Sequence, residues 1–577
     1  MNISELQQFR GEGYRFVPVI RTYEDAWIEP DVAYERLGWA SERHFLLESG
    51  KLGECSFIGG DPFATLWAKD GRAVYSSAEG EEEHQGDPLE ILRAKMSLFR
   101  SPRLPDLPKF RGGAVGLFSY DLIRYIEKMP ELSRDDLGTP DLSVLFVDKL
   151  CVLDHVKKRV HLIAHVDLGE SDDVESSIDT GSSAGTGTDA GTDAGIDAGI
   201  DAGIDTGIDA GIDTGIDAGI DTGIDAGIDA GIDAGIDADS VTGSNTGTEV
   251  DGVVKLDGLE KALADAEAQL DEWERRLFEG SSQVPAFPQN LMPGELEFSF
   301  SQSDFEQAVE RVKDYIAQGD VFQVNLSVRQ GRELGAAPYE IYKHLRVINP
   351  SPYASYLHFP DMQIVSCSPE LLVSSYGGQV NTRPIAGTRP RTGDAEQDRR
   401  AIEELRTNEK EIAEHIMLVD LERNDLGRVC RYGTVKVNEL MVIEEYSHVF
   451  HIVSNVRGEL AVEKDVYDLI RGTFPGGTIT GAPKIRCMEI IEELEPTRRG
   501  LYTGSIGWID FNGDMELNIV IRTLQVQNGK GYVQAGAGIV IDSVPEREYR
   551  ESLRKAKALW VAIETAEAKA REGATHA

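Results

Sequence analysis

Residues 195–238 consist of eleven consecutive copies of the tetrapeptide Gly-Ile-Asp-Ala or Gly-Ile-Asp-Thr. A period of four matches neither the alternation of a strand nor the turn of a helix. One glycine in four would cost a helix about 1 kcal/mol each relative to alanine. We therefore expect a disordered, low-complexity acidic insert at 167–252. The fold must then be built from an N-terminal domain, 1–166, and a second domain, 253–577.

The insert carries only part of the chain's net charge of −42. It holds 22 acidic residues and no basic one, and the rest of the chain still has 78 acidic against 58 basic residues. This charge argues against nucleic acid and anionic membranes as partners. Lysine is also scarce, with 20 Lys against 38 Arg. A lysine-poor acidic surface suits a salt-rich cytoplasm, where screening removes self-repulsion, so we expect a halophilic source.

The N-terminal segment has no basic region followed by an apolar one, as a signal peptide would. No run approaches the roughly 18–20 apolar residues of a membrane span, so we expect a cytoplasmic protein. A disulfide framework and a zinc site are not expected, because the cysteines are scattered without CxxC or Cys/His pairing. They are Cys55, Cys151, Cys367, Cys430 and Cys487.

Strand and helix patterns come in clusters along the chain. Apolar runs on either side of Asp154–Lys158 predict one β-hairpin, and Gly377-Gly378 closes a second. Helical patterns are predicted at 256–279 and 303–318, the latter capped by Ser301 or Ser303, and at Pro545–Ala568. Because no regular strand–helix–strand alternation appears, we predict an α+β fold of layered antiparallel β-sheets with flanking helices.

The segment Asn408–Cys430 is predicted to be a helix on which Glu411 and Glu414 share one face. These carboxylates are compatible with solvated surface charge, with pairing to Lys410, or with binding a hard cation. The apolar side chains at helical spacing, which we expect to form the buried face, are Ile412, Ile416 and Leu421.

Other features are ambiguous when each is taken alone. The glycine-rich stretch Thr473–Lys484 opens a helix and is either an anion-binding loop or a structural turn. Gly536–Gly538 allows close approach of a ligand or a tight strand bend. Arg522, at the end of an apolar strand, needs an anionic partner, which is either a protein carboxylate or a substrate.

His451 and the C-terminal helix are equally open. His451 alternates with valines on a strand and is compatible with a core histidine. Glu551 and Lys555 are four residues apart, as in an ordinary helical ion pair.

In this order, the segments resemble the chorismate-utilising enzymes from about Asp304 to Ile563. The motifs that carry the resemblance are PIAGTRPRTGD (384–394), EKEIAEHIMLVDLERNDLGRVC, YSHVFHIVS, FPGGTITGAPK, LYTGSIGWID, LNIVIRT, QAGAGIV and YRESLRKAKAL. Nearer the N-terminus, FLLES (45–49), CSFIGGDP and GGAVGLFSYD resemble the large subunit, component I, of anthranilate synthases. The repeat has no counterpart in that pattern.

The resemblance implies a Mg²⁺-dependent lyase that converts chorismate and ammonia to anthranilate and pyruvate, the first committed step of tryptophan biosynthesis. By resemblance Glu414 and Glu551 are the Mg²⁺ ligands, with Glu411 as a water-mediated helper, and His451 is the acid–base residue. The residues implied to bind chorismate are Gly387 and Thr388 near the ring and hydroxyl, Tyr502 and Arg522 at a carboxylate, the backbone of Gly536, Ala537 and Gly538, and Lys555.

Two positions distinguish the relatives. Isochorismate- and salicylate-forming enzymes have a water-activating Lys where this chain has Gln323. Aminodeoxychorismate synthases have a Lys nucleophile in PIKGT, where this chain has Ala386, which cannot form a covalent adduct. Both differences favour attack by ammonia at C2 and loss of pyruvate. Aminodeoxychorismate synthase and a catalytically silent chorismate or tryptophan sensor remain the alternatives.

A partner and a regulator are also implied. No cysteine lies in a glutaminase setting such as G-x-C-x-G, so a separate glutaminase subunit would supply ammonia from glutamine. Two segments match the family's tryptophan feedback site, which would inhibit the enzyme. They contribute Ser49 and the run Pro352, Tyr353 and Ala354.

Overall fold

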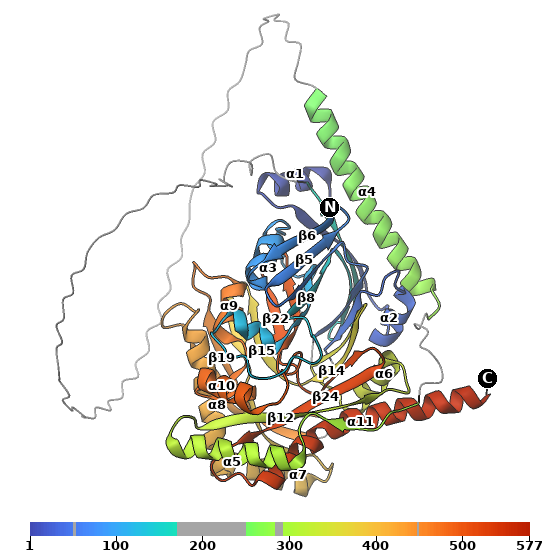
Figure 1. The fold of residues 1–577 in the computed structure, drawn as a ribbon. Coiled ribbons are helices and arrows are strands. Elements are labelled where there is room, and N and C mark those ends of the chain that lie inside the picture. The colour runs from blue at the N-terminus through green and yellow to red at the C-terminus, as the bar shows by residue number, and fades with distance from the viewer. Residues whose placement is uncertain (50–53, 170–249, 283–291, 447–448, 577) are drawn as a thin grey trace, which may run out of the picture. The chain divides into compact units, whose positions relative to one another are not determined.

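A computed structural model describes residues 1–49, 54–169, 250–282, 292–446 and 449–576 (Figure 1). Met1–Ser171 and Val254–Ala577 form one compact unit. The predicted disordered insert lies outside the described residues, apart from 167–169 and 250–252.

Two large antiparallel sheets make up this unit. The first has twelve strands, of which the short β20 (Gly481–Ala482) pairs with β12 beside the main path. Along that path the strands are β1 (Phe16–Tyr23), β10 (Arg159–Asp167), β9 (Lys149–Asp154), β3 (Cys55–Gly60), β2 (His44–Glu48), β13 (Tyr353–Phe359), β14 (Met362–Ser368), β23 (Thr523–Gln527), β24 (Lys530–Ile539), β12 (Gln323–Glu333) and β11 (Glu297–Phe298).

The second sheet also has twelve strands, with β18 (Lys436–Glu445) pairing with β19 beside the main path. The path runs β17 (Ile385–Pro390), β19 (Val449–Glu459), β16 (Gln379–Thr382), β15 (Leu371–Tyr376), β22 (Met515–Asn518), β21 (Ser505–Asp510), β7 (Gly113–Phe118), β8 (Leu142–Val147), β4 (Ala64–Lys69), β5 (Arg72–Ser77) and β6 (Gly80–Gln85).

Both sheets combine strands from the two ends of the chain. β2 pairs directly with β13, and β7 pairs directly with β21. The segments 1–166 and 253–577, which we predicted as separate domains, therefore contribute neighbouring strands to the same two sheets. This arrangement places Ser49, which follows β2, beside the start of β13.

Local sequence signals match the structure at several turns and caps. β9 and β10 form the predicted hairpin, and β15 and β16 form the hairpin closed by Gly377-Gly378. Ser301 caps α5 (Gln302–Gln318) by accepting a hydrogen bond from the backbone nitrogen of Asp304.

Helices flank the sheets, as predicted. Besides α5, the helices in the described ranges are α1 (Ile3–Gly11), α2 (Pro30–Leu37), α3 (Pro88–Ser97), α4 (Val250–Glu279), α6 (Pro338–Ile348), α7 (Ala395–Thr407), α8 (Glu409–Gly427), α9 (Val466–Thr473), α10 (Lys484–Leu494) and α11 (Pro545–His576). Two short 3-10 turns are η1 (Tyr120–Tyr125) and η2 (Gly477–Ile479). α2, α4, α6 and α11 pack on the first sheet, while α3, α8 and α9 pack on the second (Figure 1).

A third apolar cluster lies between the sheets and joins side chains from both of them. Within it, the rings of Phe110 and Trp508 stack with centroids 4.8 Å apart. Burial of each such aromatic side chain stabilises the fold by about 1.5–3 kcal/mol. The predicted α+β architecture of layered antiparallel sheets is confirmed.

Two further expectations can be compared with the structure. All five cysteines are free. None of the helices within the described ranges is both long enough and apolar enough to cross a membrane.

Candidate active site

The helix predicted at Asn408–Cys430 is α8, and Asn408 caps it by accepting a hydrogen bond from the Glu411 backbone nitrogen. Its buried face differs from the predicted one, because Ile416 is 49% exposed. The side chains buried instead are His415, Leu418, Val419, Glu422, Asp425 and Leu426. Polar side chains can be buried on this face because other segments supply hydrogen-bond and ion-pair partners for them. The spacing of apolar residues in the sequence does not reveal such partners.

Those partners come from segments that are distant in the sequence. His415 Nε2 lies 2.6 Å from Ser454 Oγ, Thr382 Oγ1 lies 2.9 Å from Glu422 Oε2, and Lys484 Nζ lies 2.5 Å from Asp425 Oδ2. Each contact ties α8 to β19, β16 or the start of α10. The helix that carries Glu411 and Glu414 is therefore held in a fixed orientation.

A bulge in β17 brings Gly387 and Thr388 to His451 on β19. The pairing register shifts between Ala386 and Thr388, and Gly387 has φ +64°, a left-handed conformation that favours glycine. His451 Nδ1 lies 3.0 Å from the Gly387 carbonyl oxygen and 3.1 Å from Thr388 Oγ1. Because a carbonyl only accepts, Nδ1 carries the proton and Nε2 is left as an acceptor.

Burial lowers the pKa of His451 to about 4, and the Arg522 guanidinium acts in the same direction. The imidazole is therefore neutral at pH 7. A neutral ring with a free Nε2 can accept a proton, whereas it has none to donate from that atom.

Glu411 lies on the other side of the same bulge. It accepts a hydrogen bond of 3.0 Å from Arg389 Nη1, and a Cβ at position 387 would lie 2.9 Å from its Oε2. Glycine at 387 thus leaves room for the Glu411 carboxylate, which already forms an ion pair with Arg389.

Glu370, between β14 and β15, is a buried carboxylate that the sequence analysis did not single out. It is 6% exposed, and its Oε1 has no hydrogen-bond partner among the described residues. Burial raises its pKa to about 7, against the opposing effects of the Thr478 hydroxyl, the Arg522 guanidinium, the Ile385 backbone and Lys555. A carboxyl group with this pKa can hold or release a proton near neutral pH. In the sequence, the only signal is its place after Ser368-Pro369 at a strand start.

Arg522 has φ +51°, a backbone conformation that is uncommon for a residue with a side chain and is often found at functional sites. Burial lowers the pKa of its guanidinium, while Glu370 and Tyr446 act to raise it. Within the described parts of the chain no carboxylate forms an ion pair with Arg522. Its charge is therefore available to an anionic ligand.

Glu414 lies on α8. Burial and the neighbouring Glu411 raise its pKa, and Lys410 and Lys555 act to lower it. Its Oε1 is 3.5 Å from Gln323 Nε2. Glu551, on α11, pairs with Lys555 at 3.2 Å. Among the described side chains, no group of three or more His, Cys, Asp or Glu is arranged as a metal cluster.

The glycines of β24 lie under amide side chains of β12. A Cβ at Gly538 would be 2.3 Å from Gln323 Nε2. The carbonyl oxygen of Gly536 accepts a hydrogen bond of 2.9 Å from Lys555 Nζ, and Ala537, between them, is buried. The stretch Gly536–Gly538 thus contacts both Lys555, which pairs with Glu551, and Gln323, which faces Glu414.

Tyr502 lies in a different environment from the rest. It lines a small cavity of about 20 Å³ together with Arg329, Arg499 and Gln534, and its ring is 5.5 Å from the Arg499 guanidinium carbon. Arg522 is not among the lining residues of this cavity. The other predicted substrate residues gather around His451, Glu370 and Glu414.

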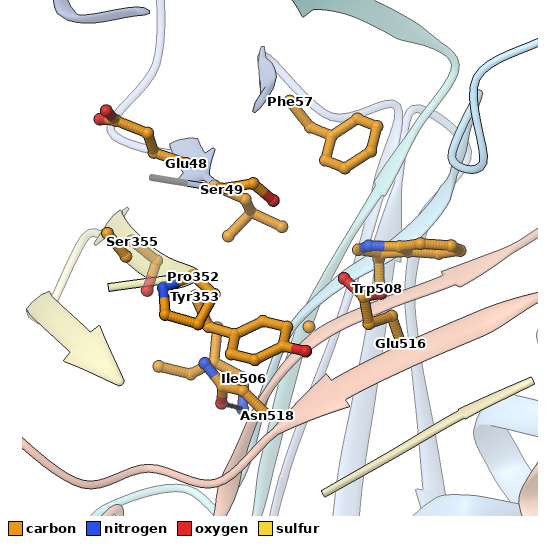
Figure 2. A pocket seen from close by; sticks show the side chains of 13 residues that line it. Glu48, Ser49, Phe57, Pro352, Tyr353, Ser355, Ile506, Trp508, Glu516 and Asn518 are labelled. Carbon is orange, nitrogen blue, oxygen red and sulfur yellow. Dashed lines mark hydrogen bonds between the residues drawn. The ribbon is translucent and has the colours of Figure 1, made fainter. Parts of the chain in front are cut away.

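The residues predicted for amino-acid binding also meet. Ser49, Pro352, Tyr353 and Ala354 line one cavity between β2, β13, β21 and β22. Its volume is about 30 Å³, that of about one water in the liquid. Figure 2 shows the Tyr353 ring extending across it toward Trp508 and Glu516. A larger ligand therefore requires a lining side chain to move.

Known proteins that are similar to this chain belong to one family. Residues 249–560 match the family model described as chorismate binding enzyme. Aminodeoxychorismate synthase component 1 of Bacillus subtilis is 43% identical, over 92% of this chain and 94% of its own length. Anthranilate synthase component 1 of Thermus thermophilus is 39% identical, over 96% of this chain and 99% of its own. The crystal structure of anthranilate synthase component I from Streptococcus pneumoniae covers 93% of this chain and 99% of its own, with a TM-score of 0.63 at 30% identity.

Proposed function

The chain belongs to the chorismate-binding enzyme family, and we propose that it attaches ammonia to chorismate as a large subunit of the anthranilate synthase type. The observation that carries this proposal is the place of Gln323. Its side chain lies between Glu414 and Gly538, among the predicted substrate residues. An amide cannot deprotonate water there, whereas ammonia is a nucleophile without a base.

The charges around the site fit a dicarboxylate substrate. Arg522 has no protein ion pair in the described ranges, and Lys555 lies close enough to influence both Glu370 and Glu414. Arg522 would hold one carboxylate of chorismate, and the Gly536–Gly538 backbone would lie against it. Tyr502 lines a cavity that does not include Arg522, and its part in holding this carboxylate stays a prediction.

The oxygen donors Glu414 and Glu551 fit a Mg²⁺ ion, which prefers carboxylates. Glu414 is a half-buried carboxylate whose raised pKa reflects burial and a neighbouring negative charge, and a cation would relieve both. When bound, Mg²⁺ would neutralise and orient a substrate carboxylate. Glu411, already paired with Arg389, would act at most through a water.

Glu370 and His451 suit different proton transfers. In the first step the C–N bond forms at C2 and the C4–O bond breaks. Glu370 gives its proton to the departing hydroxyl, which leaves as water, and the new ammonium group loses one proton to solvent. Glu370 has the pKa for this role, about 7. The neutral His451 ring lacks a proton to give at Nε2.

In the second step His451 Nε2 accepts the proton from C2, and the C–O bond to the enolpyruvyl group breaks. Enolpyruvate takes a proton from solvent and becomes pyruvate, His451 returns its proton to solvent, and anthranilate remains. Thr388 and the Gly387 carbonyl orient the imidazole for this transfer. Here His451 is a base, which narrows the acid–base role expected from the sequence.

Aminodeoxychorismate is the second candidate product. The 43% identity to the B. subtilis aminodeoxychorismate synthase favours it. Ala386 in place of the Lys nucleophile of PIKGT favours anthranilate. The two reactions differ in the carbon that receives nitrogen and in whether pyruvate leaves.

Two further parts of the proposal concern partners. A glutaminase subunit would supply ammonia from glutamine. L-tryptophan would inhibit from the pocket of Ser49, Pro352, Tyr353 and Ala354. Support for a link to the active site comes from Tyr353, which also lines a second cavity of about 470 Å³ with Tyr446. The Tyr446 ring packs edge-on against His451, with centroids 5.2 Å apart.

The test is product analysis with chorismate, Mg²⁺ and ammonium, in low and high salt, with and without tryptophan. Fluorescent anthranilate and an equal amount of pyruvate support the first candidate. Aminodeoxychorismate without pyruvate, detected after conversion by an added lyase, supports the second. Formation of neither product would refute chorismate amination.

A further inference from the structure

Strand β12 presents two amide side chains on one face, Gln323 and Asn325, because alternate residues of a strand point the same way. Gln323 Nε2 faces Glu414 Oε1 at 3.5 Å. Asn325 has no role in the proposed reaction so far. It lies one alternation further from Glu414 along the same polar face.

The backbone of Asn325 is held from two sides. Its nitrogen donates to the Thr480 carbonyl oxygen at 2.9 Å, and its carbonyl oxygen accepts from Arg499 Nη2 at 2.7 Å. Arg499 is itself buried and paired with Glu495 at 2.8 Å. The position from which the Asn325 side chain projects is therefore fixed by the glycine-rich loop and by a buried ion pair.

The Asn325 amide differs from its neighbours on this face in having an unused acceptor. The next residue along, Ser327, donates to Glu495 Oε1 at 2.8 Å and accepts from Gln534 Nε2 at 2.9 Å. By contrast, Asn325 Oδ1 is buried and has no hydrogen-bond partner among the described residues. Leaving a buried acceptor unpaired costs about 1–3 kcal/mol, which points to a partner supplied from outside the chain.

The glycines of the opposite strand make room for both amides. A Cβ at position 536 would lie 2.6 Å from Asn325 Oδ1, and one at 538 would lie 2.3 Å from Gln323 Nε2. Any side chain at either position would displace an amide. The Gly-Ala-Gly sequence therefore keeps two amides in place, each lying diagonally over one glycine.

We propose that Asn325 Oδ1 is the acceptor that receives the attacking ammonia, with Gln323 beside it. Ammonia has three N–H donors and one lone pair, so an acceptor that takes an N–H turns the lone pair away from itself. An amide oxygen can accept this N–H hydrogen bond without taking up a proton at neutral pH. Ammonia therefore stays nucleophilic, and the amide does not activate water. This inference rests on the proposed amination and assigns a positioning residue to it.

The experiment uses the full chain with ammonium salts at constant ionic strength. Asn325→Leu removes the amide at similar volume, and Asn325→Ala removes it without any risk of a clash. We expect the KM for ammonia to rise about tenfold in both, since a lost hydrogen bond of about 1.4 kcal/mol is a factor of ten. The KM for chorismate should stay within about twofold. Asn325→Asp, which keeps an acceptor, should restore a low KM for ammonia.

Gln330→Met is the matched control, because Gln330 is an amide on the same strand with a structural partner. Its Oε1 accepts from Trp560 Nε1 at 2.7 Å. This variant should lower the melting temperature and leave the KM for ammonia unchanged. The control thus shows whether losing an amide from β12 changes only the melting temperature or also the KM for ammonia.

An unchanged KM for ammonia in the Leu and Ala variants would overturn the assignment, as would an equal rise in the KM for chorismate, since Asn325 would then contact chorismate instead. These outcomes require a wild-type enzyme that aminates chorismate. If the wild type forms no amination product at all, the proposed function itself fails, and that result is distinct.

Discussion

Two buried glutamates of this molecule have opposite surroundings. Glu48, at the end of β2, is 8% exposed and accepts three hydrogen bonds, from Arg346 Nε and Nη2 at 2.9 and 2.7 Å and from Tyr342 Oη at 2.9 Å. Glu370 is 6% exposed, and one of its oxygens has no partner among the described residues. The residue type and the burial are the same, and only the partners differ.

The difference separates a structural carboxylate from a candidate catalytic one. The Arg346 pair joins α6 to β2 beside the Ser49 pocket, and both oxygens of Glu48 accept hydrogen bonds. Glu370 retains a proton near neutral pH because burial raises its pKa to about 7. A native fold keeps an unsatisfied buried carboxyl only where another requirement outweighs its cost.

The largest expected effect is at Glu370. Glu370→Gln keeps the shape and removes the ionisable proton, so kcat for ammonia-dependent turnover should fall by about 10²–10⁴. The melting temperature should stay the same or rise, because a neutral amide costs less to bury than a carboxyl group that can ionise. Steady-state kinetics and thermal unfolding measure both. Wild-type turnover by this variant would remove Glu370 from the mechanism.

Glu48→Ala should show the reverse pattern. Removing Glu48 from a largely buried ion pair leaves Arg346 with Asp31 as its one remaining carboxylate partner among the described residues. We therefore expect the free energy of unfolding to drop by about 3 kcal/mol. Turnover per folded molecule should change little. Denaturant unfolding measures the drop, and Glu35→Gln, which removes a more peripheral partner of Lys343, is the control with a drop below about 1 kcal/mol. If Glu48→Ala loses activity without losing stability, the contrast between the two glutamates is wrong.

Glu414 lies between these extremes, since it is half-buried and weakly bonded. Glu414→Gln should leave the fold intact and raise the Mg²⁺ concentration for half-maximal activity by at least about tenfold, since a charged oxygen ligand is lost. In the wild type, Mg²⁺ should bind more weakly as pH falls, because burial and Glu411 raise the pKa of this carboxylate and protons then compete with the metal. Titration calorimetry at pH 5.5 and 7.5 tests this. Equal affinity at both values, together with a fully active variant, would contradict a metal ligand at 414.

The pH dependence of kcat in the wild-type enzyme tests whether Glu370 is the general acid, without any mutation. A general acid must be protonated, and the pKa of Glu370 is raised to about 7. At saturating free ammonia, kcat should therefore be constant between about pH 5 and that pH and fall about tenfold per unit above it, while protonation of His451 lowers kcat below about pH 4. A profile that is flat to pH 9 would exclude an acid with this pKa.

Ser49 gives the smallest effect on turnover. Ser49→Phe should leave ammonia-dependent activity within about twofold while abolishing inhibition by tryptophan, because the lining of a cavity of only about 30 Å³ would be filled. Inhibition curves for the variant and the wild type test this. Inhibition that persists unchanged would place the regulatory site elsewhere, and a wild type insensitive to tryptophan would remove the regulation altogether.

Some of this protein is determined by short stretches of its sequence. Ser301 predicts the start of α5, Gly377-Gly378 predicts a hairpin, and the motif order predicts the family and the layered antiparallel sheets. These signals are local, because caps, turns and strand alternation depend on residues that are neighbours in the chain. The residues near His451 were named for the same reason, since each lies in a recognisable motif.

Only the tertiary structure revealed the environments of the remaining groups. The predicted buried face of α8 was wrong at Ile416 because Ser454, Thr382 and Lys484, distant in sequence, provide partners for polar side chains on another face. Glu370 was missed because its pKa comes from burial, and burial is decided by several strands at once. Asn325 has an unpaired oxygen only because β24, the glycine-rich loop and Arg499 surround it without offering a donor. Partners and solvent exclusion depend on the packed fold, and a single sequence position does not contain them.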